Sequence, residues 1–218
     1  MEIYLIRHAQ STNQLQESRD DLVFDPRLTQ LGRRQALLLA EYLASDEERV
    51  RFVESGIDRL RCSPMWRALQ TTLPLAQALD LTPEVWVDVH EHVLTVDGSP
   101  GGTREEIRAA FPRYRLPDGI SEKGWWHRGA ESRSACMERA IRVAGDLWER
   151  AEAHEALAIV SHARFIDALL KTFLNQLPGH GHWYHHSNTA VSRIALVDRR
   201  CEIRYLNRVA HLPPGLVS

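Results

Sequence analysis

The sequence predicts an α/β fold: a three-layer α/β/α sandwich with a mainly parallel central sheet and an inserted flap. Along its 218 residues, short apolar runs alternate with longer amphipathic segments, an order typical of parallel sheets covered by helices on both faces. No linker rich in proline or glycine divides the chain, so we expect one domain over 1–218. Loop-rich stretches predict that the flap covers about 97–132.

The first strand and helix are predicted near the N-terminus. Residues 2–6, EIYLI, are mostly apolar and predict a buried strand. The segment 28–45 then carries leucine and tyrosine side chains at helical spacing, and Thr29 stands where an N-cap hydroxyl is favoured. Together they form the first strand-helix unit.

A second unit follows. The segment 57–63, IDRLRCS, predicts a short strand, and Pro64 opens a helix over 64–79 because the first helical turn has unpaired N–H groups in any case. The segment 84–93 is expected to be extended, and 103–111 predicts a short helix.

The C-terminal part completes the predicted sheet. The segment 131–154 is a long amphipathic helix with Ser132 as its N-cap, and the apolar run ALAIVS at 156–161 is typical of a fully buried strand. The remaining predicted elements are a helix over 163–177 and strands over 189–198 and 201–209.

Charge and cysteine content limit the classes of function. The formal net charge of -2 argues against binding nucleic acid or a membrane surface through a basic face. Cys62, Cys136 and Cys201 are far apart and form no CxxC pair, which indicates neither a disulfide framework nor a zinc ribbon. No apolar stretch approaches the roughly 18 residues that span a bilayer, and no signal peptide is recognised. We therefore expect a cytoplasmic protein.

The predicted strands deliver a set of cationic and imidazole side chains to one edge of the sheet, where open α/β sheets bind ligands. In chain order these residues and their neighbours are Arg7, His8, Ser63, Arg67, His162 and Arg164. Arginine pairs its planar N–H groups with phosphoryl oxygens, and a neutral histidine can attack phosphorus. Each residue alone has a structural explanation, but their coincidence at three strand ends predicts a phosphate site that needs no metal.

Five blocks in order carry a resemblance to a known family. LIRHAQST resembles the Arg-His-Gly signature of the histidine phosphatase superfamily, also called the phosphoglycerate mutase-like family. DPRLTQLGRRQA, CSPMWRALQTTLPLA and IVSHARFIDALL resemble its following segments, and SNTAVSRIAL resembles its asparagine-containing strand near the C-terminus. The blocks span residues 3 to 196, nearly the whole chain.

The resemblance implies roles for individual residues. His8 becomes phosphorylated, and Arg7, Arg67 and His162 hold the transferred phosphoryl group. A carboxylate serves as acid and then as base, and our interpretation selects Glu91, because the family places its acid after a strand that follows the arginine-bearing helix. Partial burial would suit Glu91 to both proton transfers. Its competitors are Asp97, Glu105 and Glu106.

The loops after the two histidines depart from the family pattern. Ala9 and Ala163 stand where glycine is usual, and Gln14 takes the place of a frequent asparagine, which here is Asn13, one residue earlier. We assign Ser11, Asn13 and Ala163 to phosphate binding together with the arginines and His162, and Ser11 is the better candidate for positioning the loop.

The sequence thus predicts a metal-independent phosphatase that hydrolyses a small phosphorylated metabolite through a phosphohistidine on His8. The expected partner is a small-molecule phosphate ester, with no cofactor, no nucleic acid and no membrane, and a homodimer is compatible with the sequence. The alternatives are phosphoryl transfer of the phosphoglycerate mutase type and a non-enzymatic sensor of a phosphate ligand.

Two further motifs stay open. The histidines in HEH at 90–92 and HGHWYHH at 180–186 offer a metal site as a rival interpretation, in which the first pair points to one face of a strand. The flap carries an aromatic and basic cluster that either anchors it to the core or contacts the organic part of a substrate. This cluster consists of Trp125, Trp126, His127 and Arg128.

Overall fold

The computed structural model describes residues 1–45, 57–93, 99–126, 129–151, 155–176 and 181–218. In these ranges six strands form one sheet, in the order β3-β2-β4-β1-β5-β6. In chain order the strands are β1 (Glu2–Arg7), β2 (Arg59–Cys62), β3 (Glu84–Val85), β4 (Ala156–Ser161), β5 (Val191–Val197) and β6 (Arg200–Arg208). The first four pair in parallel, and β5 and β6 add an antiparallel edge beside β1. The mainly parallel sheet is therefore confirmed.

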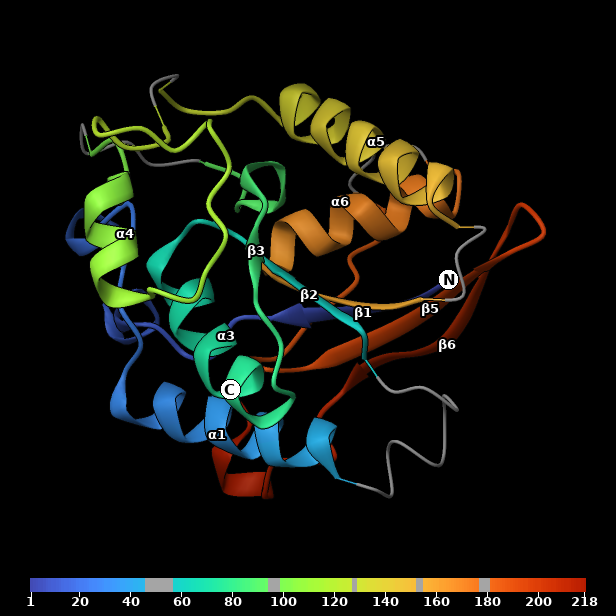
Figure 1. Ribbon diagram of the computed structural model, residues 1–218, viewed down its shortest axis with the longest axis horizontal. Coiled ribbons are helices and arrows are strands. Elements are labelled where there is room, and N and C mark those ends of the chain that lie inside the picture. Colours follow the sequence, from blue (N-terminus) through green and yellow to red (C-terminus); the bar gives the residue numbers. More distant parts are fainter. Residues whose placement is uncertain (46–56, 94–98, 127–128, 152–154, 177–180) are drawn as a thin grey trace.

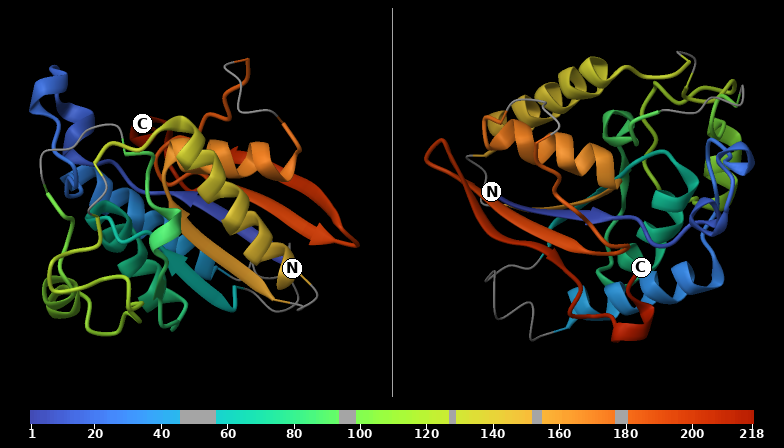
Figure 2. Two further views of the ribbon diagram at one scale, coloured as in Figure 1. Left: turned by 90° about the horizontal axis from the view of Figure 1, so that it is seen from above. Right: turned by 180° about the vertical axis from the view of Figure 1, so that it is seen from behind.

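Helices cover both faces of this sheet, which confirms the three layers (Figure 1). One face is covered by α1 and α3, and the other by α5 and α6. The helix bounds are α1 (Gln30–Ala44), α3 (Trp66–Ala78), α4 (Arg104–Ala110), α5 (Arg133–Glu149) and α6 (Ala163–Phe173). The hairpin of β5 and β6 projects at one end of the sheet in both views of Figure 2.

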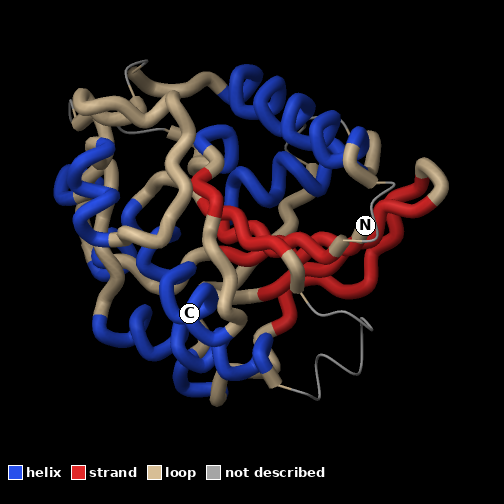
Figure 3. Tube along the Cα trace, in the orientation of Figure 1, coloured by secondary structure: helices blue, strands red, loops and turns tan. Residues whose placement is uncertain are grey.

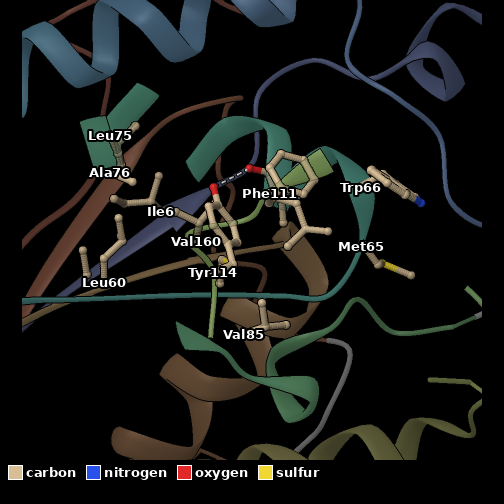
Figure 4. Packing of buried hydrophobic residues seen from close by; sticks show 14 of the residues in the cluster. Ile6, Leu60, Met65, Trp66, Leu75, Ala76, Val85, Phe111, Tyr114 and Val160 are labelled. Atoms are coloured by element: carbon tan, nitrogen blue, oxygen red, sulfur yellow. Dashed lines mark hydrogen bonds between the residues drawn. The ribbon is translucent and has the colours of Figure 1, made fainter. Parts of the chain in front are cut away.

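The central strands supply both cores by strict alternation. In β1, Tyr4 and Ile6 belong to the core on the α1 and α3 face, whereas Ile3 and Leu5 belong to the core under α5 and α6. Figure 4 shows Ile6 of β1 with Leu60 of β2 and Val160 of β4 in the first core. Because both faces of these strands are buried, their continuously apolar sequences are explained.

Both predicted N-caps are confirmed. The Thr29 hydroxyl accepts a hydrogen bond from the Gly32 backbone N–H at 2.9 Å, and the Ser132 hydroxyl accepts one from Ala135 N–H at 3.1 Å. The first turn of α1 also lies directly against the chain that follows β1, because a Cβ atom at Gly32 would collide with the Gln10 carbonyl oxygen. Glycine is required there for space.

The predicted extended segment over 84–93 is wrong for most of its length. Only Glu84–Val85 pair with β2, and the chain then turns through a 3-10 helix over Val87–Val89. The turn directs Val89, which is fully buried, into the core under α5 and α6. Burial of this side chain by helices distant in sequence overrides the local tendency to be extended.

Residues 99–126 of the predicted flap contribute α4 and long loops. These lie at the left of Figure 3, on the side where β1 ends. The Trp125 and Trp126 backbone N–H groups both donate to the Pro100 carbonyl at 2.9 Å, which closes the loop on itself. Its motion as a flap stays a prediction, as does the one-domain organisation.

Cys62, Cys136 and Cys201 are all free. Burial raises the pKa of the first two thiols to about 12, which keeps them protonated near neutral pH. Among the described residues, no helix has the length and apolar character needed to cross a membrane.

Candidate active site

Three parallel strands end at the same level and bring the predicted site residues together. Arg7 pairs in register with Ser161, the last residue of β4, and Cys62 at the end of β2 pairs with Val160. The next residue on β1, His8, donates its backbone N–H to the Ser161 carbonyl at 2.9 Å. The sheet ladder therefore fixes the backbone on which the first imidazole stands.

Two hydrogen bonds set the tautomer of His8. Its Nδ1 lies 2.7 Å from the Ala9 carbonyl oxygen, which can only accept, so Nδ1 carries the proton. Its Nε2 accepts a hydrogen bond from Arg67 Nε–H at 3.2 Å. The lone pair of the imidazole is thus on Nε2 and is directed at a cation, where an anion would also bind.

The environment of His8 favours its neutral form. Burial lowers the pKa of His8 well below its ordinary value of 6.5, and the cations of Arg67 and Arg7 lower it further, whereas the hydrogen bond to Ala9 acts in the opposite direction. At neutral pH the ring is unprotonated on Nε2, which is the state that a nucleophile requires.

The second imidazole, His162, faces the first. It is fully buried at the N-cap position of α6, and the two rings are 5.0 Å apart between centroids. Its Nε2 lies 2.8 Å from the Ser63 hydroxyl, the residue that follows β2. The pKa of His162 is lowered well below its ordinary value of 6.5, mainly by burial and next by the Arg67 cation.

Arg7 and Arg67 surround the imidazoles with donors. Arg7 Nη1 donates to the His186 carbonyl at 2.6 Å, and Arg67 Nη1 lies 3.7 Å from Asp25 Oδ1 in a buried ion pair. Arg7 Nε, Arg67 Nη1 and His162 Nδ1 are buried and make no hydrogen bond within the described ranges. Buried polar atoms without hydrogen bonds are rare in proteins, and the two arginine N–H groups suit the oxygens of a phosphoryl group.

Glu91 lies at the same edge, held by α6. Its Oε1 accepts hydrogen bonds from His92 N–H at 2.9 Å and from Phe165 N–H, in the first turn of α6, at 3.2 Å. Burial lowers the pKa values of Arg7 and Arg67, and the Glu91 carboxylate opposes this in both, as does Asp25 for Arg67. The carboxylate is therefore close enough to act electrostatically on the phosphate-binding arginines.

The loop after His8 separates the other predicted residues. Ser11 is buried, and its N–H donates to Gln14 Oε1 at 3.1 Å. The Asn13 side chain binds the Val23 backbone instead: Nδ2 donates to the Val23 carbonyl at 2.7 Å, and Oδ1 accepts from the Val23 N–H at 3.2 Å. Asn13 thus lies outside the hydrogen-bonded group around His8. Ala163 is the first residue of α6, next to His162. Binding of phosphate by Ser11, Asn13 and Ala163 stays a prediction.

Asn188 supports the nucleophile in a way that the motif alone did not indicate. Its Nδ2 donates to the His8 carbonyl at 2.9 Å, and its amide forms a head-to-tail pair with that of Gln14. The next residue, Thr189, donates its N–H to the Arg7 carbonyl at 3.1 Å from a left-handed backbone with φ of 56°. A strained β-branched residue beside a site is typical of a position fixed by its surroundings.

Arg139 on α5 is also absent from the sequence prediction. It is buried and donates to the backbone carbonyls that precede Glu91. A signal for it exists in the sequence, because Arg139 interrupts the apolar stripe formed by Cys136, Ala140, Val143 and Leu147.

The histidines of the rival metal interpretation do not share one face of a strand, because 90–92 is not a strand. His90 packs against Trp125 and Trp126, with ring centroids 5.3 Å and 4.9 Å away, while His92 Nε2 bonds the Glu131 carbonyl at 3.0 Å. In the ranges that the structure describes, no group of three or more His, Cys, Asp or Glu residues could hold a metal ion.

The two tryptophans of the predicted flap are buried, with 6% and 7% of their surfaces exposed. His127 and Arg128 lie outside the described residues, so the role of the cluster in contacting substrate stays a prediction. Of the carboxylates that competed with Glu91, Glu105 and Glu106 belong to the first turn of α4, and Asp97 also lies outside the described part.

Comparison with solved structures finds the same fold. The α-ribazole phosphatase from Shigella flexneri has a TM-score of 0.68 at 19% identity, covering 95% of this chain and 96% of that one. A phosphoserine phosphatase mutant from Entamoeba histolytica has a TM-score of 0.66 at 20% identity, with coverage of 97% and 99%. A mycobacterial glucosyl-3-phosphoglycerate phosphatase has a TM-score of 0.61 at 20% identity, with coverage of 95% and 99%.

No curated protein sequence matches the chain. Residues 3–209, in contrast, match the family described as Histidine phosphatase superfamily (branch 1). The match covers almost all of the sheet, including the ends of β1 and β4, which His8 and His162 follow. The chain belongs to the histidine phosphatase superfamily, branch 1.

Proposed function

We propose that this protein is a phosphomonoesterase that hydrolyses a small phosphorylated metabolite through a phosphohistidine on His8. One observation carries the proposal: the neutral His8 presents its Nε2 lone pair among arginine donors, at a hydrogen-bond distance of 3.2 Å from Arg67. A nucleophile and the groups that bind the phosphoryl oxygens are thereby combined in one place.

In the first step, His8 Nε2 attacks phosphorus. The N–P bond forms as the P–O bond to the organic alcohol breaks, and the leaving oxygen takes a proton from the carboxyl group of Glu91. Arg7, Arg67 and His162 stabilise the charge on the three equatorial oxygens. Because arginine supplies positive charge at this position, the proposed step needs no metal ion.

In the second step, water attacks the phosphorus of the phosphohistidine. The Glu91 carboxylate accepts a proton from that water, the P–N bond breaks, and its electron pair returns to His8 Nε2. Orthophosphate leaves, and His8 and Glu91 regain their original protonation states. Within the described ranges Glu91 Oε2 has no hydrogen-bond partner, which leaves this oxygen available for both proton transfers.

We expect the organic part of the ester to lie on the Glu91 side of the phosphoryl group, because the leaving oxygen takes its proton from Glu91. A cavity of about 260 Å³ lies between α5 and α6, and its lining includes His92, whose N–H donates to Glu91 Oε1, but none of Arg7, His8, Arg67 or His162. The solved relatives are phosphatases of phosphoserine, glucosyl-3-phosphoglycerate and α-ribazole compounds. They support small phosphorylated metabolites as the substrate class, while the individual substrate differs among them.

The test combines a metabolite panel with detection of the intermediate. The purified protein is incubated with phosphorylated metabolites in EDTA, and rapidly quenched samples are analysed for phosphohistidine by mass spectrometry under alkaline conditions. We expect phosphate release and a phosphate on His8, both lost in His8→Ala. Turnover that persists in His8→Ala would overturn the mechanism. A panel without turnover favours a ligand sensor, and transfer of phosphate to a second metabolite in preference to water favours a mutase.

A further inference from the structure

Arg139 makes an unusually complete set of contacts with the segment that carries Glu91. Its Nη1 donates to the carbonyls of Asp88 and His90 at 2.7 Å and 2.8 Å. Its Nε and Nη2 bind the two oxygens of Glu131 at 2.9 Å and 2.7 Å. A weaker bond of 3.5 Å from Nη2 reaches the Glu91 carbonyl itself. The guanidinium thus contacts the backbone immediately before and at the proposed acid.

The same side chain also contacts the other support of Glu91. The Arg139 guanidinium lies over the Phe165 ring, 4.5 Å from its centroid. Phe165 is the residue whose N–H holds the Glu91 carboxylate. Arg139 therefore touches both sides of the acid: the chain that carries it and the aromatic residue whose backbone binds it.

Burial makes this arrangement specific. The Arg139 side chain is 3% exposed and that of Glu131 is 7% exposed, so the ion pair is shielded from water. A buried guanidinium is tolerated only when its N–H groups are paired, and here carbonyls of residues 88–91 are among its partners. Moving that segment would break hydrogen bonds to a buried cation, which is energetically costly, so these bonds hold the segment in place.

No strand pairs with this region, which we call the acid segment (88–93). Besides Arg139, it is held by Glu131, whose N–H donates to the Val93 carbonyl at 2.7 Å, and by Ser161, whose hydroxyl donates to the Val89 carbonyl at 2.7 Å. Side chains and loop backbone therefore hold the acid segment in place, as pairing with neighbouring strands holds β1.

We propose that Arg139, paired with Glu131, is a positioning residue that holds the Glu91 carboxyl group where it can protonate the leaving oxygen. This inference rests on the proposed function of Glu91. Because Arg139 acts through Glu91, its loss should harm only the step that needs the acid. A residue that merely stabilises the fold would affect all substrates equally.

The experiment uses two phosphate esters with different needs for an acid. A nitrophenolate leaves without being protonated, whereas an alkoxide requires a proton in the transition state. We measure kcat/KM, which reports the steps up to formation of the phosphoenzyme, for p-nitrophenyl phosphate and for the best alkyl phosphate of the metabolite panel. In Arg139→Lys, we expect kcat/KM to fall about 100-fold for the alkyl ester and to stay within roughly threefold for the aryl ester. Equal losses, or no loss with either ester, would overturn the inference.

Arg142→Ala is the matched control. Arg142 lies on the same helix and pairs with the Asp88 side chain at 3.8 Å, but it is 56% exposed and contacts no carbonyl of the acid segment. We expect the ratio of the two kcat/KM values to be unchanged. A selective loss in Arg142→Ala as large as in Arg139→Lys would assign the effect to charge on α5 and overturn the role of Arg139.

Two further variants keep the test decisive. The contacts of Arg139 with Glu131 and with the acid segment are called the clamp. If Arg139→Lys does not fold, Glu131→Gln weakens the clamp with less disturbance, and we expect a smaller loss of kcat/KM that is again selective for the alkyl ester. An equal loss for both esters contradicts the inference. Glu91→Gln separates the two proposals. If Glu91→Gln lowers kcat/KM equally for both esters, Glu91 is not the acid and the inference fails with it. If Glu91→Gln is selective and the clamp variants are not, only the inference fails.

Discussion

The two halves of the candidate site are held by different means. The nucleophile half, with His8, Arg67 and His162, is attached to strand ends and to the first turns of the helices that follow β2 and β4. The acid half, with Glu91, follows a strand of only two residues and is held by α5 side chains and the start of α6. Backbone ladders define the first half, and side-chain contacts define the second.

This difference teaches where each half can change. A ladder position is specified by the main chain, so the place of the His8 backbone depends on strand pairing and on the few groups that bind the chain beyond β1, such as the Asn188 amide. The acid segment depends on a few buried polar side chains, each of which must be satisfied. Variants on the first half should therefore affect every substrate alike, and variants on the second half should discriminate between leaving groups.

The largest effect is expected from Arg67→Lys. Lysine cannot offer a planar pair of N–H groups or reproduce the hydrogen bond to His8 Nε2. We expect kcat/KM to fall about 100- to 1000-fold for alkyl and aryl esters alike, as when one donor to a transition-state oxyanion is lost. Arg59→Lys, at the opposite end of β2 and partly exposed, is the control and should retain activity. A loss confined to alkyl esters would place Arg67 with the acid instead.

Asn188→Ala should weaken the nucleophile half through its backbone. The substitution removes the hydrogen bond to the His8 carbonyl and removes the Asn188 Oδ1 acceptor of Gln14 Nε2. We expect unfolding in urea to become easier by about 1–3 kcal/mol and kcat/KM to fall for both esters in parallel. Asn13→Ala, whose amide binds the Val23 backbone, should cost less activity. An equal or larger loss of activity in Asn13→Ala would favour the predicted contact of Asn13 with phosphate.

Acidification should destabilise the nucleophile side through His211. Burial lowers the pKa of His211 from 6.5 to about 4, and its Nε2 lies 2.9 Å from the Thr189 hydroxyl. Between these pH values the unfolded chain binds a proton that the folded chain does not, so stability decreases as pH falls through this window. One such proton contributes a slope of up to about 1.4 kcal/mol per pH unit. Urea unfolding from pH 8 to pH 4 should show a shallower slope for His211→Gln below pH 6.5 and the same slope above it. An unchanged slope at low pH would mean that His211 is protonated in the folded protein.

The smallest effect is expected at the helix cap of the acid side. Ser132→Ala removes the N-cap bond of α5 and should lower the free energy of unfolding by about 1 kcal/mol. Arg139 lies farther along the helix, so the ratio of alkyl to aryl activity should not change. Thr29→Ala is the counterpart at α1, and because the Thr29 hydroxyl also bonds Gln10 Oε1 at 2.8 Å, it should additionally reduce activity with both esters. A change of the ester ratio in Ser132→Ala would show that the clamp depends on the cap.

The same division explains what the sequence could predict. The continuously apolar runs that became β1 and β4 identify strands on their own, and Thr29 and Ser132 identify helix starts by local hydrogen bonding. His8 and His162 follow directly, because a residue after a parallel strand must lie at its carboxyl edge. Local patterns thus sufficed to place His8 and His162.

The rest depends on contacts between residues distant in sequence. The turn at Val87–Val89 replaces a predicted extended segment because the buried Val89 side chain packs under α5 and α6. The clamp joins Arg139 to residues 88–91 across about 50 positions of the chain. The amide that supports His8 comes from Asn188, 180 residues away. No periodicity or cap reports such pairings, since each becomes visible only when the helices are placed on the sheet.

The close approach of Gly32 to the Gln10 carbonyl has a consequence for sequence variation. Any larger side chain at position 32 must push the first turn of α1 away from the chain that leaves His8. A saturation library at this position should therefore retain function with glycine alone, even though it lies in a helix, where glycine is otherwise disfavoured. In related enzymes, α1 can move relative to the nucleophile only if the loop that contains Gln10 changes as well. We therefore expect substitutions in these two segments to occur together.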